Sequence, residues 1–371
     1  MKIGLCGPFA PGDELYQPAF ARALRSLGHE VCEFQWGKYF TGYPKFHGYM
    51  NRRELPSRLA LQLMSGPRIR AMNAQCLAWG QNCRPDFWFF WNSWPIYPDI
   101  LRKLKSLAPV ALYTNDNPFV NATMTYHWPL RWRFWKQQAR LADVIFYFRD
   151  SDLARYRSWD MTECHLFPAY FVPELHRPIQ LTPEEQARWA SDLVFIGRYE
   201  PVRAEWLRKL LGSGFQVQVY GTGWPRKAWP FPVQAVRGED YLKALCGAKI
   251  ALGFLSNLAH DRVTSRTFEI PACGAVMAAL DSPELRSLFE PEKEIILYHS
   301  FADLVDKLRH YLRHPEKLRS ISLHAVQRCR NSRYDIASRA AVVVQHLQAW
   351  LNQVSAPRAP MPAPVGNYTM V

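Results

Sequence analysis

The sequence alternates short apolar segments with segments of helical periodicity, and this alternation limits the possible folds more than any other feature. In the first half, the apolar runs Lys2–Cys6, Phe87–Trp91 and Val144–Phe148 are separated by amphipathic stretches, of which Leu15–Leu27 is the first. Continuous apolar strands are typical of parallel sheets that are covered on both faces. Parallel strands joined by helices require right-handed crossovers. We therefore predict an α/β chain built from doubly wound sheets.

A proline-rich segment divides the alternation into two blocks. Four prolines fall between residues 168 and 183, where no periodicity is clear, and the alternation of strands and helices restarts at Asp192–Ile196. With 371 residues, the chain is long enough for two cores. The predicted parts are a Rossmann-like N-terminal domain, a linker, a Rossmann-like C-terminal domain, a helix that crosses back to the first domain and a disordered tail, over 1–170, 171–190, 191–335, 336–354 and 355–371.

The net charge of +14 is concentrated near the N-terminus. Between residues 38 and 84, a single acid, Glu54, stands against a larger set of cations: Lys38, Lys45, Arg52, Arg53, Arg58, Arg68, Arg70 and Arg84. Such a field attracts anionic partners, including phospholipid head groups, nucleic acid and phosphorylated acceptors. The alternative, a solvated basic surface that binds no partner, has equal weight, because net charge is evidence about association and not about the reaction.

The sequence also bears on location. No apolar stretch approaches the roughly 18 residues of a transmembrane helix, and the chain begins with a strand and not with a signal core. None of the eight cysteines forms a C-x-x-C pair, so neither a zinc site nor a redox motif is indicated, and several lie in apolar runs as buried thiols do. We expect a cytoplasmic protein that contacts a membrane, if at all, only peripherally through its basic N-terminal domain.

Two segments of the second half carry residues that could bind a nucleotide diphosphate. In the first, a strand ends at Gly197, and Arg198 and Arg203 lie on the loop beyond it. Ligands of doubly wound sheets bind beyond the carboxyl ends of the strands. Two guanidinium groups there can grip a diphosphate in forked fashion. The alternative is a surface ion pair between Arg198 and Glu200.

The second segment, Asp261–Glu269, is more specific because it runs from a strand into a helix. Thr264 or Ser265 would cap that helix and leave amides free for phosphate oxygens. Arg266 in the first turn opposes the helix dipole, which favours contact with an anion. Glu269 lies between apolar neighbours and needs a partner, such as ribose hydroxyls. The alternative is a pair between Glu269 and Arg266 at i, i+3.

The second half resembles the nucleotide-sugar domain of GT-B glycosyltransferases, and in particular the CgeB-like, spore-maturation group. The resemblance covers roughly residues 192–344 and rests mainly on three segments, Phe195–Tyr199, Val219–Gly223 and Ser265–Ala275. It implies the GT-B fold, in which two Rossmann-like doubly wound domains face each other across a cleft. It further implies metal-independent transfer of a sugar from a nucleotide-diphosphate sugar to an acceptor hydroxyl, with the nucleotide sugar as substrate and no cofactor.

Position by position, the resemblance also implies a donor site. The diphosphate would contact Arg198, Arg203, Ser265 and Arg266, and the ribose would contact Glu269. The loop for the base or donor would contain Gly221, Gly223, Arg237 and Gly238. The donor loop of the N-terminal domain would contain Gly12. Asp261 falls where retaining members carry the first glutamate of an E-x7-E pair, which contacts the donor sugar. We expect retention, although the shorter aspartate leaves inversion open.

The first half supplies two further candidates for catalysis. Asp116 follows a strand, where it could act as the general base of an inverting transfer, or could only form a turn. His127 is a candidate contact to the donor sugar, or a structural residue. No second carboxylate lies at D-x-D spacing near Asp116, so no metal site is predicted. The aromatic and basic segment Trp128–Lys136 could lie at a membrane interface, stack on bases, or pack on the sheet.

Two other functions stay open at this point. One is an enzyme of the same fold that glycosylates modified nucleic acid, which the basic N-terminal domain favours. The other is a non-catalytic protein that binds a sugar nucleotide or a glycan, which aspartate in place of glutamate at 261 favours. A sugar epimerase would share the fold, but the sequence shows no acid and base residues for that reaction.

Overall fold

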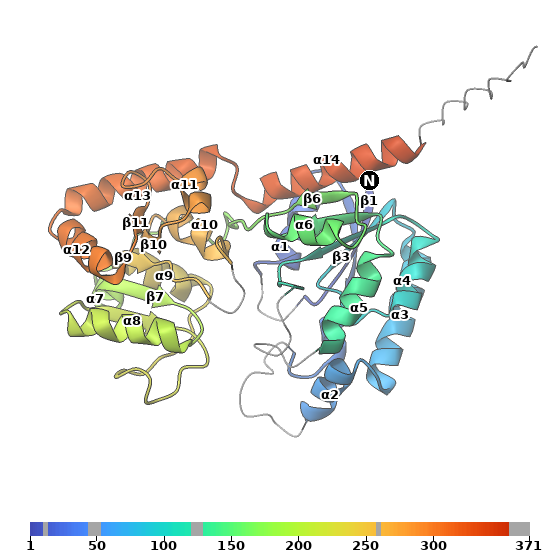
Figure 1. Ribbon diagram of the computed structural model, residues 1–371, viewed down its shortest axis with the longest axis horizontal. Coiled ribbons are helices and arrows are strands. Elements are labelled where there is room, and N and C mark those ends of the chain that lie inside the picture. Colours follow the sequence, from blue (N-terminus) through green and yellow to red (C-terminus); the bar gives the residue numbers. More distant parts are fainter. Residues whose placement is uncertain (10–13, 44–52, 120–128, 257–260, 356–371) are drawn as a thin grey trace, which may run out of the picture.

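The computed structural model describes residues 1–9, 14–43, 53–119, 129–256 and 261–355, which form two α/β domains (Figure 1). The N-terminal strands are β1 (Lys2–Gly7), β2 (Glu30–Gln35), β3 (Phe87–Trp91), β4 (Val110–Thr114), β5 (Val144–Tyr147) and β6 (Cys164–Leu166). The helices around them are α1 (Gln17–Ser26), α2 (Leu55–Leu63), α3 (Pro67–Cys83), α4 (Pro98–Lys105), α5 (Pro129–Ala139) and α6 (Asp152–Arg157), with a 3-10 turn η1 (Trp36–Tyr39).

The second domain repeats the alternation. Its strands are β7 (Ser191–Ile196), β8 (Val217–Tyr220), β9 (Ala248–Leu252), β10 (Val276–Leu280) and β11 (Ile296–Tyr298). Its helices are α7 (Pro183–Trp189), α8 (Pro201–Gly212), α9 (Glu239–Gly247), α10 (Ser265–Ala272), α11 (Pro283–Leu288), α12 (Phe301–Leu312) and α13 (Pro315–Asn331), and α14 (Ile336–Ser355) follows. Within the described residues the strand orders are β2-β1-β3-β4-β5-β6 and β11-β10-β9-β7-β8, and all pairs are parallel.

The N-terminal sheet is covered on both faces, as its apolar strands predict. Every side chain of β3 is buried, and successive residues point to opposite faces. Trp88 belongs to a core shared with α3, α4 and α5, whereas Phe89 belongs to a core shared with α1 and α14. The ring of Phe20 from α1 lies 4.9 Å from that of Phe89. The carboxyl ends of the strands therefore form the only edge at which short loops can hold polar residues near a ligand.

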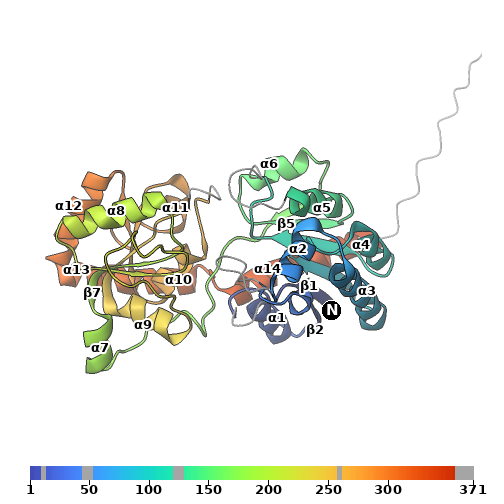
Figure 2. The ribbon, with the colours of Figure 1, turned by 90° about the horizontal axis from the view of Figure 1, so that it is seen from below.

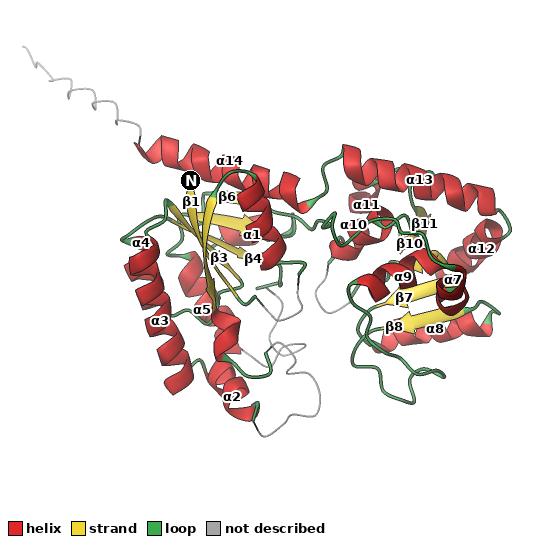
Figure 3. Ribbon diagram, turned by 180° about the vertical axis from the view of Figure 1, so that it is seen from behind, coloured by secondary structure: helices red, strands yellow, loops and turns green. Residues whose placement is uncertain are grey.

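The chain passes between the domains twice, and the two passages are hydrogen-bonded to each other. The amide of Phe171 donates to the carbonyl of Tyr334 at 3.2 Å, and the amide of Ile336 donates to the carbonyl of Phe171 at 3.0 Å. After this crossing, α14 lies along the N-terminal domain, where it packs against α1 (Figures 1 and 3). The C-terminal end of the chain thus completes the first domain, and the predicted tail beyond residue 355 lies outside the described residues.

Helix α7 corrects the predicted extent of the linker over 171–190. The hydroxyl of Thr182 accepts from the amide of Glu185 at 3.2 Å, and the carboxylate of Glu185 accepts from the amide of Thr182 at 3.0 Å. This capping box starts a helix that packs against α9 of the C-terminal domain. The prolines around it suggested a linker, although the Thr-Pro-Glu-Glu sequence at 182–185 is a helix start signal.

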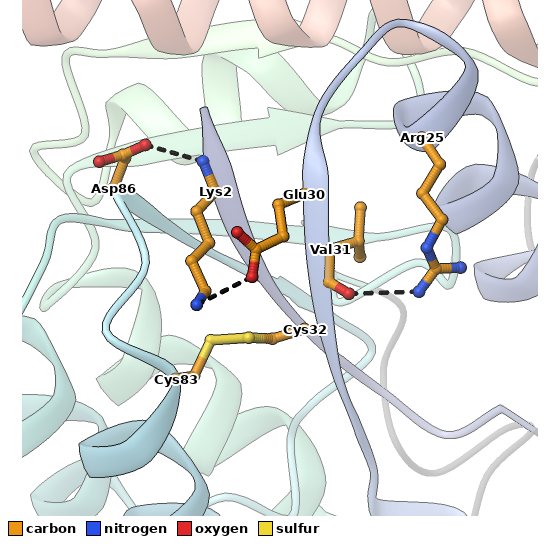
Figure 4. Close-up of a disulfide and its surroundings, with 7 residues drawn as sticks. All are labelled: Lys2, Arg25, Glu30, Val31, Cys32, Cys83 and Asp86. Carbon is orange, nitrogen blue, oxygen red and sulfur yellow. Dashed lines mark hydrogen bonds and ion pairs between the residues drawn. A yellow bond between two sulfur atoms is a disulfide. The ribbon is translucent and has the colours of Figure 1, made fainter.

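A disulfide joins Cys32 to Cys83, although the sequence pattern predicts buried thiols at several of the cysteines and no pairing (Figure 4). It joins β2 to the end of α3 across 51 residues, with the Cα atoms 6.4 Å apart. Beside it, the ammonium group of Lys2 contacts Glu30 at 2.9 Å, and the amide of Lys2 donates to Asp86 at 2.7 Å (Figure 4). The two cysteines become neighbours only through the tertiary fold, so their spacing carried no signal.

The described residues contain no helix that combines the length and the apolar character needed to cross a membrane.

Candidate functional site

The loops that follow β7 and β8 are bound to each other at the carboxyl edge of the C-terminal sheet. The amide of Tyr199 donates to the carbonyl of Thr222 at 3.0 Å, and the amide of Gly197 donates to the carbonyl of Tyr220 at 2.8 Å. Gly221 has a φ of +145°, and a Cβ atom there would lie 1.8 Å from the carbonyl oxygen of Gly197. Only glycine fits this close approach of two backbones. The loops therefore have little freedom to separate.

Both arginines of the β7–α8 segment lie at this edge, in different environments. Arg198 is exposed, and a Cβ atom at Gly223 would lie 3.7 Å from the Cγ atom of its side chain. Arg203 is largely buried, and its Nε atom donates to the carbonyl of Leu255 at 3.0 Å. Its Nη1 atom lies 3.0 Å from Glu200, so the acid pairs with Arg203 and the alternative ion pair with Arg198 is wrong. Burial lowers the pKa of Arg203, although the negative charge of Glu200 acts to raise it.

Helix α10 brings a third arginine to the same place. The residue before the helix is Thr264, whose amide donates to the hydroxyl of Thr267 at 3.2 Å, and Ser265 is the first helical residue. Burial acts to lower the pKa of Arg266, but Tyr241 and Glu269 raise it. The Nε atom of Arg266 is buried and has no hydrogen-bond partner among the described residues. An arginine with an unpartnered Nε at a helix N-terminus favours an anion.

Glu269 lies one turn further along α10 and is 4% exposed. One of its carboxylate oxygens accepts a 2.7 Å hydrogen bond from the hydroxyl of Tyr241, on α9. Glu269 raises the pKa of Arg266, so the two charges attract each other, although no ion pair between them is found among the described residues. Burial raises the pKa of Tyr241 well above its usual value, and the charge of Glu269 adds to this. Tyr241 therefore stays a neutral hydrogen-bond donor that holds the carboxylate.

His176 closes this cluster from the segment that joins the domains. Its ring lies 6.0 Å from that of Tyr241, and its Nδ1 atom accepts from the amide of Val172 at 3.0 Å. Burial lowers the pKa of His176, Glu269 raises it and Arg266 lowers it. A neutral imidazole whose Nδ1 accepts a hydrogen bond carries its proton on Nε2. Neither His176 nor Tyr241 was singled out in the sequence, because both reach the site from other elements.

Asp261 meets the N-terminal domain at this edge. Its Oδ1 atom accepts a hydrogen bond from Nε of Arg149, which follows β5. Nη2 of Arg149 donates to the carbonyl of Asn115 at 3.1 Å, and Nη1 lies 3.5 Å from Asp152. The side chains of Arg149 and Asp261 are only 7% and 13% exposed. The sequence gave no reason to select Arg149, since its partner is on the other domain.

The remaining predicted residues are placed less centrally. Asp116 directly follows Asn115 at the end of β4, and its carboxylate forms an ion pair with Arg131 on α5. Arg237 and Gly238 are exposed just before α9. Gly12 and His127 lie outside the described residues. The structure therefore gathers Arg198, Arg203, Ser265, Arg266 and Glu269 at one edge, with Asp261 bound across to the N-terminal domain.

The aromatic segment of the N-terminal domain has a structural environment. Trp135 on α5 is fully buried, and its indole donates to the hydroxyl of Tyr156 at 3.2 Å. The guanidinium of Arg131 lies 4.4 Å from the ring centre of Trp132. Of the three alternatives for this segment, the structure shows packing on the sheet. Trp128 lies outside the described residues.

The comparisons with known proteins point to one class. Residues 202–345 match the family model described as glycosyl transferase-like, a span that includes Arg203, Asp261, Arg266 and Glu269. In a comparison with curated proteins, no sequence matches the chain.

Solved structures match almost the whole chain. Sucrose-phosphate synthase from Thermosynechococcus elongatus is 15% identical, with a TM-score of 0.68 over 96% of this chain and 100% of that one. HepE of Anabaena, in complex with UDP-glucose, is 12% identical, with a TM-score of 0.61 over 94% and 100%. A trehalose 6-phosphate synthase from Burkholderia multivorans is 10% identical, with a TM-score of 0.59 over 95% and 99%.

At these identities the likeness shows the fold, and the predicted architecture of two Rossmann-like domains is confirmed. The family match, over the segment that carries most of the clustered residues, agrees with the predicted class of enzyme. This chain therefore has the GT-B fold, and its segment 202–345 is similar to glycosyltransferases.

Proposed function

We propose that this protein transfers a sugar from a nucleotide-diphosphate sugar to an acceptor hydroxyl, and that the donor binds at the carboxyl edge of the C-terminal sheet. The observation that carries the proposal is the pair Arg203 and Arg266. The side chain of Arg203 is largely buried, and the buried Nε of Arg266 has no hydrogen-bond partner among the described residues. A diphosphate would supply the missing negative charge and hydrogen-bond acceptors.

The neighbours of this pair fit the rest of a donor. The exposed Arg198 and the N-terminal turn of α10 at Ser265 extend the positive region toward solvent. Glu269, held by Tyr241, presents a fixed carboxylate that ribose hydroxyls can share. In the reaction, the departing diphosphate gains negative charge, and preorganised cations stabilise that charge without rearranging. HepE was solved with UDP-glucose, which supports a nucleotide sugar as the donor class.

Asp261 is the proposed contact to the donor sugar. Arg149 holds one of its carboxylate oxygens from the opposite domain, so the carboxylate lies where the two domains meet. We further propose retention, independence of a metal ion, membership of the CgeB-like group and a cytoplasmic location. Retention would be tested by NMR assignment of the product anomer, and metal independence by activity in the presence of a chelator.

A binding panel tests the proposal without knowledge of the acceptor. Thermal unfolding would be followed with UDP-, GDP-, dTDP- and ADP-sugars, each with a chelator and with added Mg²⁺. We expect one nucleotide to raise the midpoint, equally in both conditions, because ligand that binds only the folded state stabilises it. Arg266→Gln should abolish the shift, while Arg286→Gln, which removes an exposed cation paired with Asp281, should preserve it.

If no nucleotide shifts the wild-type midpoint, the proposed donor site is wrong. If binding is present but transfer to water or to simple acceptors never occurs, the non-catalytic alternative replaces the transferase.

A further inference from the structure

Helix α2 has apolar side chains on both of its faces. Its inner face buries Ser57, Ala60 and Leu61 against the N-terminal domain. Its outer face bears three leucines at i, i+4 and i+8, and Leu55, Leu59 and Leu63 are 41%, 43% and 62% exposed. A surface helix normally carries polar residues on the face away from the core. A row of exposed leucines therefore indicates a surface that meets something other than water.

Cations gather where this row ends. The hydroxyl of Tyr97 donates to the carbonyl of Met64, the residue after Leu63, at 3.1 Å. Both Tyr97 and Met64 line a pocket of 590 Å³ on the outside of the domain, together with Arg140 and Arg102. The amide of Tyr97 donates to Asn73 of α3 at 2.6 Å, and Arg70 lies one turn before Asn73 on that helix, so α3 brings Arg70 to the side of the same pocket.

The charge around the row is mainly positive, and the one acid beside it in the sequence is Glu54, which directly precedes Leu55. Residues 55–85 contain no aspartate or glutamate, and Arg70 and Arg140 are both exposed. The pocket has one acidic residue, Asp99, whose carboxylate is paired with Arg102 at 2.6 Å. Helix α2 lies at the end of the N-terminal domain away from α14, on the side that Figure 2 presents to the reader. Leucines and arginines thus share one outer surface.

From this arrangement we infer that Leu55, Leu59 and Leu63, with Arg70 and Arg140, form a docking surface for a bilayer of anionic phospholipid, which we call the α2 surface. The leucines enter the boundary between head groups and acyl chains, and the arginines bind lipid phosphates. Charge complementarity selects this occupant, since an uncharged apolar partner would leave the arginines unused. The inference does not depend on the proposed donor site.

Sedimentation of the full-length protein with vesicles tests this docking. We expect binding to vesicles of phosphatidylcholine mixed with phosphatidylglycerol, little binding to phosphatidylcholine alone, and weaker binding as salt rises. The double variant Leu59→Glu/Leu63→Glu should lose binding. Arg70→Glu/Arg140→Glu should weaken it by at least about fivefold for each cation removed.

Matched control variants come from α13 of the other domain. Leu323 is 71% exposed, and Arg319 is exposed one turn before it, so Leu323→Glu and Arg319→Glu make the same chemical changes elsewhere. Both controls should bind vesicles as the wild type does. Circular dichroism melting of all variants confirms that loss of binding is not loss of folding.

Three results would overturn the inference. The first is equal sedimentation with neutral and anionic vesicles, and the second is unchanged binding of the α2 variants. The third is a wild-type dimer, seen by light scattering, that Leu59→Glu/Leu63→Glu converts to a monomer without any vesicle binding. In that case the leucines cover a second copy of this chain.

Discussion

At the scale of single residues, the candidate site depends on side chains that satisfy one another from different elements. Glu269 is held by Tyr241, and Tyr241 packs on His176. The sequence identified Glu269 because a carboxylate between apolar neighbours needs a partner. It could not identify Tyr241 or His176, because α9 and the interdomain segment approach α10 only in the folded chain. Local patterns find a charged residue in an unusual place, but not the residue that supports it.

Tyr241→Phe should weaken nucleotide binding without removing it. The change deletes the 2.7 Å hydrogen bond to Glu269 and keeps the ring that packs on His176. Loss of one hydrogen bond to a charged group costs about 1.5–3 kcal/mol when the bond is buried. Titration calorimetry should therefore show at least about a tenfold higher Kd for the nucleotide. An unchanged Kd would show that the tyrosine does not position the carboxylate.

His176 predicts a pH dependence of stability. Because burial lowers its pKa in the folded state, the folded protein binds this proton less readily than the unfolded chain. The contribution of His176 to the free energy of unfolding is complete above the pKa of about 6.5 that a histidine has in the unfolded chain, and it is lost as the pH falls below that value. Glu269 and Arg266, which face His176, act on its pKa in opposite directions.

Urea unfolding at pH 7.5 and 5.5 measures this effect. The loss of unfolding free energy on acidification should be smaller in His176→Gln than in the wild type. His324→Gln, which changes a histidine at the surface of α13, serves as the control. Equal losses in the wild type and His176→Gln would contradict the assignment.

At the scale of elements, most strands and helices follow from apolar runs and 3.6-residue periodicity. Helix α3 is the largest exception, because Gly80 and several polar residues on its exposed side weaken the periodic pattern. Helix α7 was concealed by prolines, although its capping box was visible in the sequence. The disulfide joins β2 to α3, so it could not be predicted while α3 itself was not recognised.

Reduction of the Cys32–Cys83 disulfide should lower the unfolding free energy. The bond closes a loop of 51 residues, and cross-links of this length contribute about 2–4 kcal/mol by restricting the unfolded chain. Urea unfolding with and without dithiothreitol measures the change, and Cys32→Ser should show no further effect of reductant. Cys164→Ser, which removes a free thiol, is the control. A wild type that is insensitive to reductant, or that binds alkylating reagent at both positions, would contradict the bond.

The disulfide also bears on location. Disulfides persist in oxidising compartments and are rare in the cytosol, so it does not favour the expected cytoplasmic location. In a reducing cytosol Cys32 and Cys83 would be thiols, with β2 and α3 held by their apolar contacts alone.

At the scale of the whole molecule, the two domains meet through Arg149 and Asp261 and through the crossing at Phe171. The fold was predictable because each domain repeats a local pattern of strand and helix. The contact between the domains was not, because Arg149 and Asp261 are 112 residues apart and their pairing depends on how the domains face each other.

A double-mutant cycle measures this contact. Arg149→Gln and Asp261→Asn, alone and together, should give a coupling of about 1.5–3 kcal/mol in unfolding, because the pair is buried. The exposed pair Lys209 and Glu205 on α8 should give no measurable coupling. Additive effects of the two buried changes would show that the domains are not held by this ion pair.

The central claim is that three arginines and a helix N-terminus bind a nucleotide diphosphate. Calorimetric titration of the nucleotide selected by thermal unfolding, into wild type, Arg266→Gln and the control Arg286→Gln, tests it most directly. We expect binding in the wild type and the control, and a loss of at least about 1.5–3 kcal/mol of binding free energy in Arg266→Gln, because a charged hydrogen bond disappears. Equal affinity in all three proteins would show that the diphosphate, if it binds at all, binds elsewhere.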